Sequence, residues 1–386
     1  MTQQNKKNKY KKILKELEFY KDKDFTFSSG HILGSMCTKP HIIAKESFMK
    51  FIDTNLGDPE LFPGTKQIES KYISFILKLL NAPKTATGLI GSGGTESNIT
   101  AVWLAKSLSK KSEIIIPKTA HFSFDKIASL MDIKLVTVPV DKNYCMNISD
   151  FKKNLSKDTA AVVGIAGTTE LGTVDPIPEI SDICRDEKIF LHVDAAFGGF
   201  VIPFLKKLGQ NIPDFDFNLK GVMSISVDAH KMGYSTIPLG LLAVRKEEWL
   251  DNISVKTPYI STKKQPGILA TRSGGPVAAA YAVSKFLGIK GYKDLIKRCM
   301  NVTKYTVEKI DNIDLNLVIK PTMNVIGIRL KNPSKVVKRL TQYGWKVNNM
   351  ERLSAVRIVI MPHVTKEIID KFIPDLKKVC KEVGEL

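Results

Sequence analysis

The chain has 386 residues, of which 43% are hydrophobic and 25% are charged, a composition typical of globular proteins. This length predicts two domains, or one large domain with an appendage. The apolar stretches have the length of strands and fall far short of the ~20 residues that a membrane span requires. The basic N-terminus also lacks the compact apolar segment of a secretory signal. We therefore expect neither a membrane protein nor a secreted one.

The net charge of +19 admits two interpretations. A nucleic-acid backbone would favour so many lysines, but a lysine-rich surface also keeps a protein in solution. Because the lysines are spread over the whole chain without a nucleic-acid-binding module, we expect no nucleic-acid partner, although the field would still attract small anions. Five scattered cysteines, never in a CxxC pair, predict reduced thiols, a cytoplasmic location and no metal or disulfide framework.

The chain opens with a predicted amphipathic helix, in which Ile13, Leu14 and Leu17 recur at helical spacing. Ordered loops rich in Gly, Pro and Thr follow. From about residue 71 to 246, short apolar runs alternate with amphipathic pieces such as the predicted helix at 179–187. The apolar runs predict buried strands at residues 113–117, 134–140, 160–167, 189–196 and 222–228.

Continuous apolar strands that alternate with helices predict an α/β fold with a largely parallel sheet covered on both faces. After about residue 290 the pattern changes to that of a smaller α+β domain, with a helix at 333–344, a strand at 355–362 and a helix at 365–383. We therefore expect three parts: an N-terminal helix and loop segment (1–70), a large domain (71–290) and a small C-terminal domain (291–386). In open α/β sheets, ligands bind beyond the carboxyl ends of the strands.

A glycine-rich segment, IGSGGTESN at residues 90–98, precedes a predicted helix that begins near Thr95. Small residues let backbone amides approach a phosphate, and a helix N-terminus adds donors and a favourable dipole. The segment is neither GxGxxG nor a Walker P-loop, so it specifies no nucleotide. A turn that only caps the helix explains this segment equally well by itself.

Two motifs place polar side chains just beyond predicted strands. In IFLHVDAAFGGF, Asp194 either caps the next helix or pairs with a protonated ring nitrogen, since a buried carboxylate needs a partner. Ala196 then leaves room for a flat ligand. In AHFSF, His121 is either a packed residue or one that stacks on such a ligand from the side opposite Ala196.

Lys231 follows the strand VMSISVD in the sequence DAHKMG. Lysine is rarely buried without a reason, and a desolvated lysine among other cations has a lowered pKa and can form a Schiff base. Asp194 and Lys231 are 37 residues apart (231 − 194), which fits two strands of one sheet.

Together these residues supply a phosphate cradle, a stacking histidine, an acid for a ring nitrogen and a lysine for an aldehyde. Pyridoxal phosphate carries a phosphate, a pyridine ring and an aldehyde, so the sequence predicts this cofactor. With Asp194 keeping the ring nitrogen protonated, the ring would draw electrons from the α-carbon of an amino acid.

At this point the sequence resembles the group II pyridoxal-phosphate-dependent decarboxylases, and among them the archaeal L-tyrosine/L-aspartate decarboxylases. The motifs that carry the resemblance are NLGDPELFPGT, SGGTESN, AHFSFDK, GIAGTTELGT, HVDAAFGGFVIPF, DAHKMG and RIVIMPH. The resemblance implies an aminotransferase-like fold (fold type I), with a mostly parallel seven-stranded sheet in the large domain and a smaller C-terminal α+β domain.

The resemblance also implies a role for each residue around the cofactor. In chain order, these are phosphate contacts by Gly94 and Thr95, ring stacking by His121, a ring-hydroxyl contact by Thr169, ring-nitrogen pairing by Asp194, packing below the ring by Ala196, a phosphate contact by His230 and Schiff-base formation by Lys231. Asp228 stands where relatives often have a phosphate-binding Asn or Ser, and an acid beside a phosphate is unfavourable unless it is protonated or turned away.

Two further positions concern the substrate. Residues 257–268, TPYISTKKQPGI, resemble the mobile catalytic loop of the family, in which Tyr259 would protonate the α-carbon after carbon dioxide leaves. The alternative is an ordinary loop tyrosine. Arg357 resembles the position at which fold relatives bind a substrate carboxylate.

The implied reaction is α-decarboxylation of L-tyrosine to tyramine or of L-aspartate to β-alanine, which in relatives feed methanofuran and coenzyme A synthesis. Relatives are homodimers with active sites at the subunit interface, and we expect the same here. Two alternatives stay open. A sphingosine-phosphate-type lyase shares SGGTES, HVDAxxGGF and DxHKxG, and a basic nucleic-acid-binding protein could use a degenerate cofactor fold.

Overall fold

The computed structural model describes residues 3–258 and 263–386. Its apolar strands form a seven-stranded sheet in the order β1-β7-β6-β5-β4-β2-β3, in which β7 is antiparallel to both neighbours and the other pairs are parallel. The prediction of a largely parallel α/β sheet is therefore confirmed. The strands are β1 (Thr87–Gly91), β2 (Glu113–Pro117), β3 (Lys134–Val138), β4 (Thr159–Ile165), β5 (Phe190–Asp194), β6 (Val222–Asp228) and β7 (Gly240–Val244).

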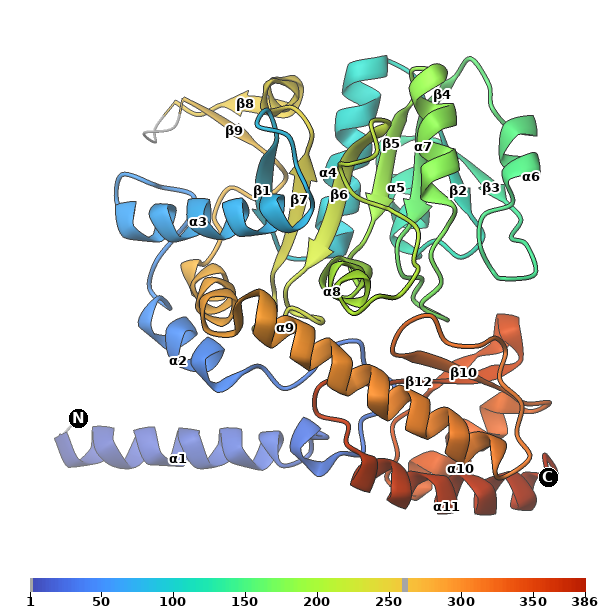
Figure 1. The fold of residues 1–386 in the computed structure, drawn as a ribbon. Coiled ribbons are helices and arrows are strands. Elements are labelled where there is room, and N and C mark those ends of the chain that lie inside the picture. The colour runs from blue at the N-terminus through green and yellow to red at the C-terminus, as the bar shows by residue number, and fades with distance from the viewer. Residues whose placement is uncertain (1–2, 259–262) are drawn as a thin grey trace.

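Helices cover both faces of this sheet (Figure 1). In β4, Val162 packs into the core shared with α7 and α8, whereas Ala161 and Val163 pack into the core shared with α4 and α5. Two covered faces explain why the strands are continuous apolar runs instead of alternating patterns. The helices of this domain are α3 (Pro63–Leu79), α4 (Gly94–Ser109), α5 (Ser123–Met131), α6 (Ile148–Lys153), α7 (Ile177–Asp186) and α8 (Ile202–Lys207).

The long helix α9 (Gly274–Asp311) leads from the large sheet to the small domain (Figure 1). It is kinked at Gly288, whose φ of 55° and ψ of −170° are not helical and suit a residue without a Cβ. The expected boundary between residues 290 and 291 lies inside α9, just beyond this kink. The three-part division of the chain remains a prediction.

The small domain has a three-stranded antiparallel sheet in the order β10-β12-β11. Two amphipathic helices, α10 and α11, bury their apolar faces in the core of this domain. Its elements are β10 (Val325–Arg329), α10 (Pro333–Gln342), β11 (Asn348–Met350), β12 (Ala355–Val359) and α11 (Lys366–Val383).

The N-terminal segment contacts both parts. Helix α2 (Ile42–Lys50) packs against α9, and Ile32 forms a β-bridge with Lys346 of the small domain. Helix α1 (Gln3–Lys21) contains no buried residue, and Figure 1 shows it running beneath α2.

Five predicted strands correspond to β2 through β6, whereas β1, β7 and the extent of α9 were not predicted. In the two stretches that the structure describes, no helix combines the length and the apolar character that crossing a membrane requires. The remaining short elements are η1 (Phe27–Ser29), η2 (Gly198–Phe200), η3 (Glu247–Ile253), β8 (Ser254–Lys256), β9 (Lys264–Pro266) and η4 (Glu351–Leu353).

Candidate active site

A cavity of about 380 Å³ lies beyond the carboxyl ends of β4, β5 and β6, the place where open α/β sheets bind ligands. All nine residues expected to contact the cofactor line this cavity. The lining residues are Ser92, Gly93, Gly94, Thr95, Asn98, Thr119, His121, Phe122, Ile165, Gly167, Thr169, Asp194, Ala196, Phe197, Asp228, His230 and Lys231.

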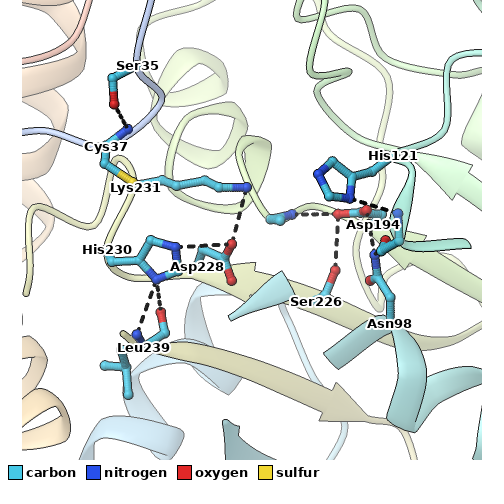
Figure 2. Close-up of polar contacts among 12 residues, drawn as sticks. Ser35, Cys37, Asn98, His121, Asp194, Ser226, Asp228, His230, Lys231 and Leu239 are labelled. Atoms are coloured by element: carbon cyan, nitrogen blue, oxygen red, sulfur yellow. Dashed lines mark hydrogen bonds and ion pairs between the residues drawn. The ribbon is translucent and has the colours of Figure 1, made fainter. Parts of the chain in front are cut away.

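Lys231 and Asp194 come from neighbouring strands, because β5 and β6 are paired in parallel. Lys231 Nζ lies 3.2 Å from Asp228 Oδ2 (Figure 2). Burial opposes the charged form of Lys231, but the carboxylates of Asp228 and Asp194 outweigh it, so the pKa of this lysine is raised from its usual value. The prediction of a lowered pKa is therefore wrong: the nearest charged neighbours are acids and not cations.

Asp194 is buried at the end of β5 and accepts three hydrogen bonds. The donors are Asn98 Nδ2 at 2.9 Å, the backbone amide of Ala196 at 3.0 Å and Ser226 Oγ at 3.2 Å. Burial disfavours the charged carboxylate, but Lys231 and these donors favour it, and the pKa of Asp194 is lowered from its usual value. The side chain is thus an ionised acceptor, as a protonated ring nitrogen requires.

His121 lies in the turn after β2 and lines the same cavity as Lys231, with its ring near Asp194 (Figure 2). Its Nδ1 accepts a hydrogen bond from the amide of Ser123 at 3.2 Å. Burial and the nearby Lys231 lower the pKa of His121, and Asp194 opposes them only partly. A neutral imidazole at this position can stack on a flat, electron-poor ring.

The glycine segment forms the N-terminal end of α4, which begins at Gly94. A Cβ on Gly94 would lie 3.0 Å from the Cβ of Ala196 and 3.2 Å from Asp228 Oδ2. Only a residue without a side chain leaves this space for a ligand. The free amides and the dipole of the helix end then favour an anion.

His230 packs against this segment. The Cβ of a side chain at Gly93 would lie 3.0 Å from His230 Cε1. His230 Nδ1 lies 2.8 Å from the carbonyl oxygen of Leu239, and its Nε2 lies 3.7 Å from Asp228 Oδ2. Asp228 is therefore turned toward Lys231 and His230.

The residues present fit pyridoxal phosphate. A glycine cradle at a helix end suits its phosphate, and Lys231 and Asp194 suit its aldehyde and ring nitrogen. Two buried polar atoms that border the cavity, Thr119 Oγ1 and Asp228 Oδ1, also have no hydrogen-bond partner among the described residues. Buried polar groups are usually paired, so such orphaned atoms are typical of a ligand site.

Arg357, in β12, does not belong to the cavity wall formed by the described residues. Its Nη1 donates to the carbonyl oxygen of Thr169, and its Nη2 donates to the carbonyl oxygen of Gly34 at 2.7 Å and to Asn348 Oδ1 at 2.8 Å. The guanidinium thus holds the turn that carries Thr169 against the small domain. Its contact with a substrate carboxylate remains a prediction, and Tyr259 lies outside the described residues.

Sequence reasoning missed Asn98, which bonds Asp194 directly, and His192, which bonds Asn98. A sequence signal existed for each. Asn98 stands one helical turn after Gly94. His192 stands two residues before Asp194 in β5, so the side chains of His192 and Asp194 point to the same face of the sheet.

Comparisons with known proteins agree with this geometry. A family model described as the pyridoxal-dependent decarboxylase conserved domain matches residues 27–331. The L-aspartate/L-glutamate decarboxylase of Pyrococcus horikoshii is 47% identical over 373 residues, which cover 95% of this chain and 97% of that protein. The probable L-tyrosine/L-aspartate decarboxylase of Methanothermobacter thermautotrophicus is 44% identical over 91% of this chain and 98% of its own length.

Two solved structures are similar over 97% of this chain. A sphingosine-1-phosphate lyase from Burkholderia pseudomallei has a TM-score of 0.88 at 25% identity, with 90% of its chain covered. A glutamate decarboxylase from Lactobacillus brevis has a TM-score of 0.87 at 22% identity, with 92% covered, which shows a shared fold. With the family model and the close relatives, the conclusion is that this chain belongs to the pyridoxal-dependent decarboxylases and is a carboxy-lyase whose cofactor is pyridoxal phosphate.

Proposed function

We propose that the protein removes the α-carboxyl group of L-aspartate or L-tyrosine, with L-aspartate as the first candidate. The observation that carries the reaction type is one cavity that is lined by both Lys231 and the ionised Asp194. In this cavity Lys231 is paired with Asp228. Both relatives described above carry aspartate in their names, which supports this choice of substrate. A chain with a net charge of +19 also attracts an acidic amino acid.

Lys231 would bind the aldehyde of the cofactor through its Nζ, and Asp194 would accept a hydrogen bond from the protonated ring nitrogen. When bound, the cofactor supplies an electron-poor ring that accepts the electron pair left behind by carbon dioxide. His121 and Ala196 would hold the ring from its two faces, and Thr169 would contact the ring hydroxyl.

Gly94, Thr95 and His230 would hold the phosphate at the helix end. Asp228 would have a different task, since its Oδ2 lies 3.2 Å from Lys231 Nζ. It would compensate the charge of the free lysine before the cofactor arrives.

Two residues would act on the substrate. Tyr259 would return a proton to the α-carbon once carbon dioxide has left. Arg357 already bonds the carbonyl oxygens of Thr169 and Gly34 and the side chain of Asn348, so its first role in this proposal is to support Thr169.

The proposed assembly is a homodimer with interface active sites. Support comes from α1, where large apolar side chains recur on one stripe and stay exposed, among them Leu14 at 42% and Leu17 at 57%. An isolated helix of this length is marginal in water, and a second copy of the chain would cover the stripe.

The sphingosine-phosphate-type lyase is the second candidate, because one structure of that type reaches 25% identity. The decarboxylase is better supported by relatives at 44% and 47% identity. The two reactions leave different products: a lyase releases an aldehyde and phosphoethanolamine, and a decarboxylase releases carbon dioxide and an amine.

Substrate choice is tested by incubating the holoenzyme with each L-amino acid and measuring carbon dioxide release and the amine product. β-Alanine from L-aspartate or tyramine from L-tyrosine is the expected result, and these products would feed coenzyme A or methanofuran synthesis. Release from neither amino acid contradicts the proposed substrates, and an aldehyde product from a sphingoid phosphate favours the lyase.

A further inference from the structure

A chain of buried polar side chains leads away from Asp194 into the interior of the large domain. Asn98 Nδ2 lies 2.9 Å from Asp194 Oδ2, Asn98 Oδ1 lies 3.0 Å from His192 Nε2, and His192 Nδ1 lies 2.8 Å from Ser224 Oγ. Asn98 is 1% exposed, and His192 and Ser224 are fully buried. Polar groups at such depth cost stability unless every one is paired, so this arrangement calls for an explanation beyond packing.

The donors and acceptors of this chain can be assigned from one end. Ionised Asp194 only accepts, so the amide nitrogen of Asn98 must face it and the amide oxygen of Asn98 must face His192. His192 Nε2 therefore carries a proton. Burial lowers the pKa of His192 to about 4, so the ring is neutral and its Nδ1 accepts a hydrogen bond from the hydroxyl of Ser224.

The assignment has a consequence for Asn98. If its amide turned over, its oxygen would face the carboxylate oxygen of Asp194, and its nitrogen would meet the N–H of His192. Both contacts would be repulsive. The carboxylate of Asp194 therefore sets the orientation of Asn98, and the N–H of His192 pairs the amide oxygen of Asn98 in that orientation. Asn98 Nδ2 also lies 3.2 Å from Ser123 Oγ.

We propose that Asn98, His192 and Ser224 are positioning residues that keep Asp194 ionised and aimed at the ring nitrogen of the cofactor. Of these three, only Asn98 lines the cavity, so His192 and Ser224 act through it. The inference rests on the proposed role of Asp194 and deepens it: the acid that pairs with the ring nitrogen accepts a hydrogen bond from an amide whose oxygen is paired by a neutral histidine.

Other charged or titratable groups also act on Asp194. Lys231 favours its ionised form, and Lys231 and Asp228 both influence His121 across the cavity. Because these groups lie on the cavity side and His192 lies on the buried side, a change at His192 leaves them in place.

The main experiment compares three holoenzymes loaded with cofactor that is labelled with ¹⁵N in its ring. They are the wild type, His192→Leu and His192→Gln, and the ¹⁵N shift of the ring nitrogen is followed as the pH rises. His192→Leu leaves the buried amide oxygen of Asn98 without its partner and so weakens the hold of Asn98 on Asp194. The ring nitrogen of this variant should therefore lose its proton about one to two pH units lower than that of the wild type. Glutamine can donate from nearly the position of Nε2, so His192→Gln should restore most of the shift.

Thr159→Val is the matched control. Thr159 is buried at the start of β4, at the other end of the sheet, where its hydroxyl bonds Glu113 at 3.0 Å. The control should lose stability without moving the ring-nitrogen titration. An unchanged titration in His192→Leu, or an equal change in Thr159→Val, overturns the proposal.

A second measurement does not need the cofactor or the variants. ¹H–¹⁵N NMR of the imidazole nitrogens in the cofactor-free wild type should show His192 with its proton on Nε2 and no titration between pH 5 and 8. A proton on Nδ1, or a titration within this range, contradicts the assignment even if all variants fail to fold. A wild type that takes up no labelled cofactor contradicts the proposed roles of Lys231 and Asp194 instead, which keeps the two failures distinct.

Discussion

The phosphate cradle should be destroyed by a single methyl group at Gly240. This residue lies in β7 between Gly91 of β1 and Asp228 of β6 in the strand register. A Cβ built on it would lie 2.5 Å from the Cα of Gly93 and 2.7 Å from Asp228 Oδ1. Since the nearest atom is backbone and not the end of a flexible side chain, the Gly240→Ala variant can relieve the contact only by moving the cradle.

The size of the effect follows from this distance. Ordinary contact begins near 3.4 Å, so the backbone of Gly93 must move by about 0.9 Å (3.4 − 2.5). Moving an amide that far from an acceptor at ~2.9 Å breaks the hydrogen bond. Loss of one such bond to a phosphate weakens binding by about 1.5–3 kcal/mol, or roughly 10- to 100-fold in Kd.

The assay titrates cofactor-free protein with pyridoxal phosphate and, separately, with pyridoxal, and follows absorbance. Gly240→Ala should lose affinity for pyridoxal phosphate while its affinity for pyridoxal, which lacks the phosphate, stays within about twofold of the wild type. Gly64→Ala is the control, because a Cβ there meets nothing within 4 Å. Unchanged binding of pyridoxal phosphate by Gly240→Ala, or equal losses for both ligands, refutes the reasoning.

Three further predictions follow from other parts of the chain. Burial raises the pKa of Asp175 to about 7, so the folded protein keeps a proton there that the unfolded chain releases near pH 4. The contribution of Asp175 to the unfolding free energy is therefore complete below pH 4 and is lost as the pH rises through 7. Between pH 5 and 7 the unfolding free energy of the wild type should therefore fall by about 2 kcal/mol more than that of Asp175→Asn, as measured by urea denaturation at both pH values. Equal falls in the unfolding free energy of the two proteins would reject this account. Tyr259→Phe should bind the cofactor normally but slow amine formation at least about 100-fold, as measured by single-turnover product analysis; an unchanged rate and product would remove Tyr259 from the mechanism. Replacing Leu14 and Leu17 with Ser should shift the protein from dimer to monomer in light scattering, whereas Lys15→Ser should not, and equal masses for all variants would argue against α1 as an interface element.

The position of the site could be predicted because its residues directly follow strands. Asp194 and Lys231 come after two apolar runs, and the parallel pairing of β5 with β6 brings them to one edge of the sheet. The positions of both side chains at this edge of the sheet were therefore recognisable from local patterns alone.

The supporting interactions could not be predicted, because they depend on the tertiary arrangement. Asn98 and His192 are 94 residues apart in the chain and meet only when α4 packs across β5. The raised pKa of Lys231 depends in the same way on the acids that the sheet places beside it. The hydrogen bonds from Arg357 to backbone carbonyl groups of distant segments could not be predicted either, because no sequence pattern marks those carbonyl groups.

Helix α9 and strand β7 were missed for a different reason. The pattern of α9 is interrupted at Gly288, where the chain leaves helical geometry and then resumes it, so a local reading ends the helix there. Strand β7 inserts between β1 and β6 as an antiparallel neighbour, and strand order of this kind depends on long-range pairing.

The most direct test of the account identifies the lysine that carries the cofactor. The holoenzyme is treated with borohydride, digested, and mapped by mass spectrometry for the peptide that carries the reduced pyridoxyl group. The account predicts one modified residue, Lys231, and no label in the Lys231→Ala protein. A label on another lysine, or a wild type that stays unlabelled after incubation with pyridoxal phosphate, would contradict it.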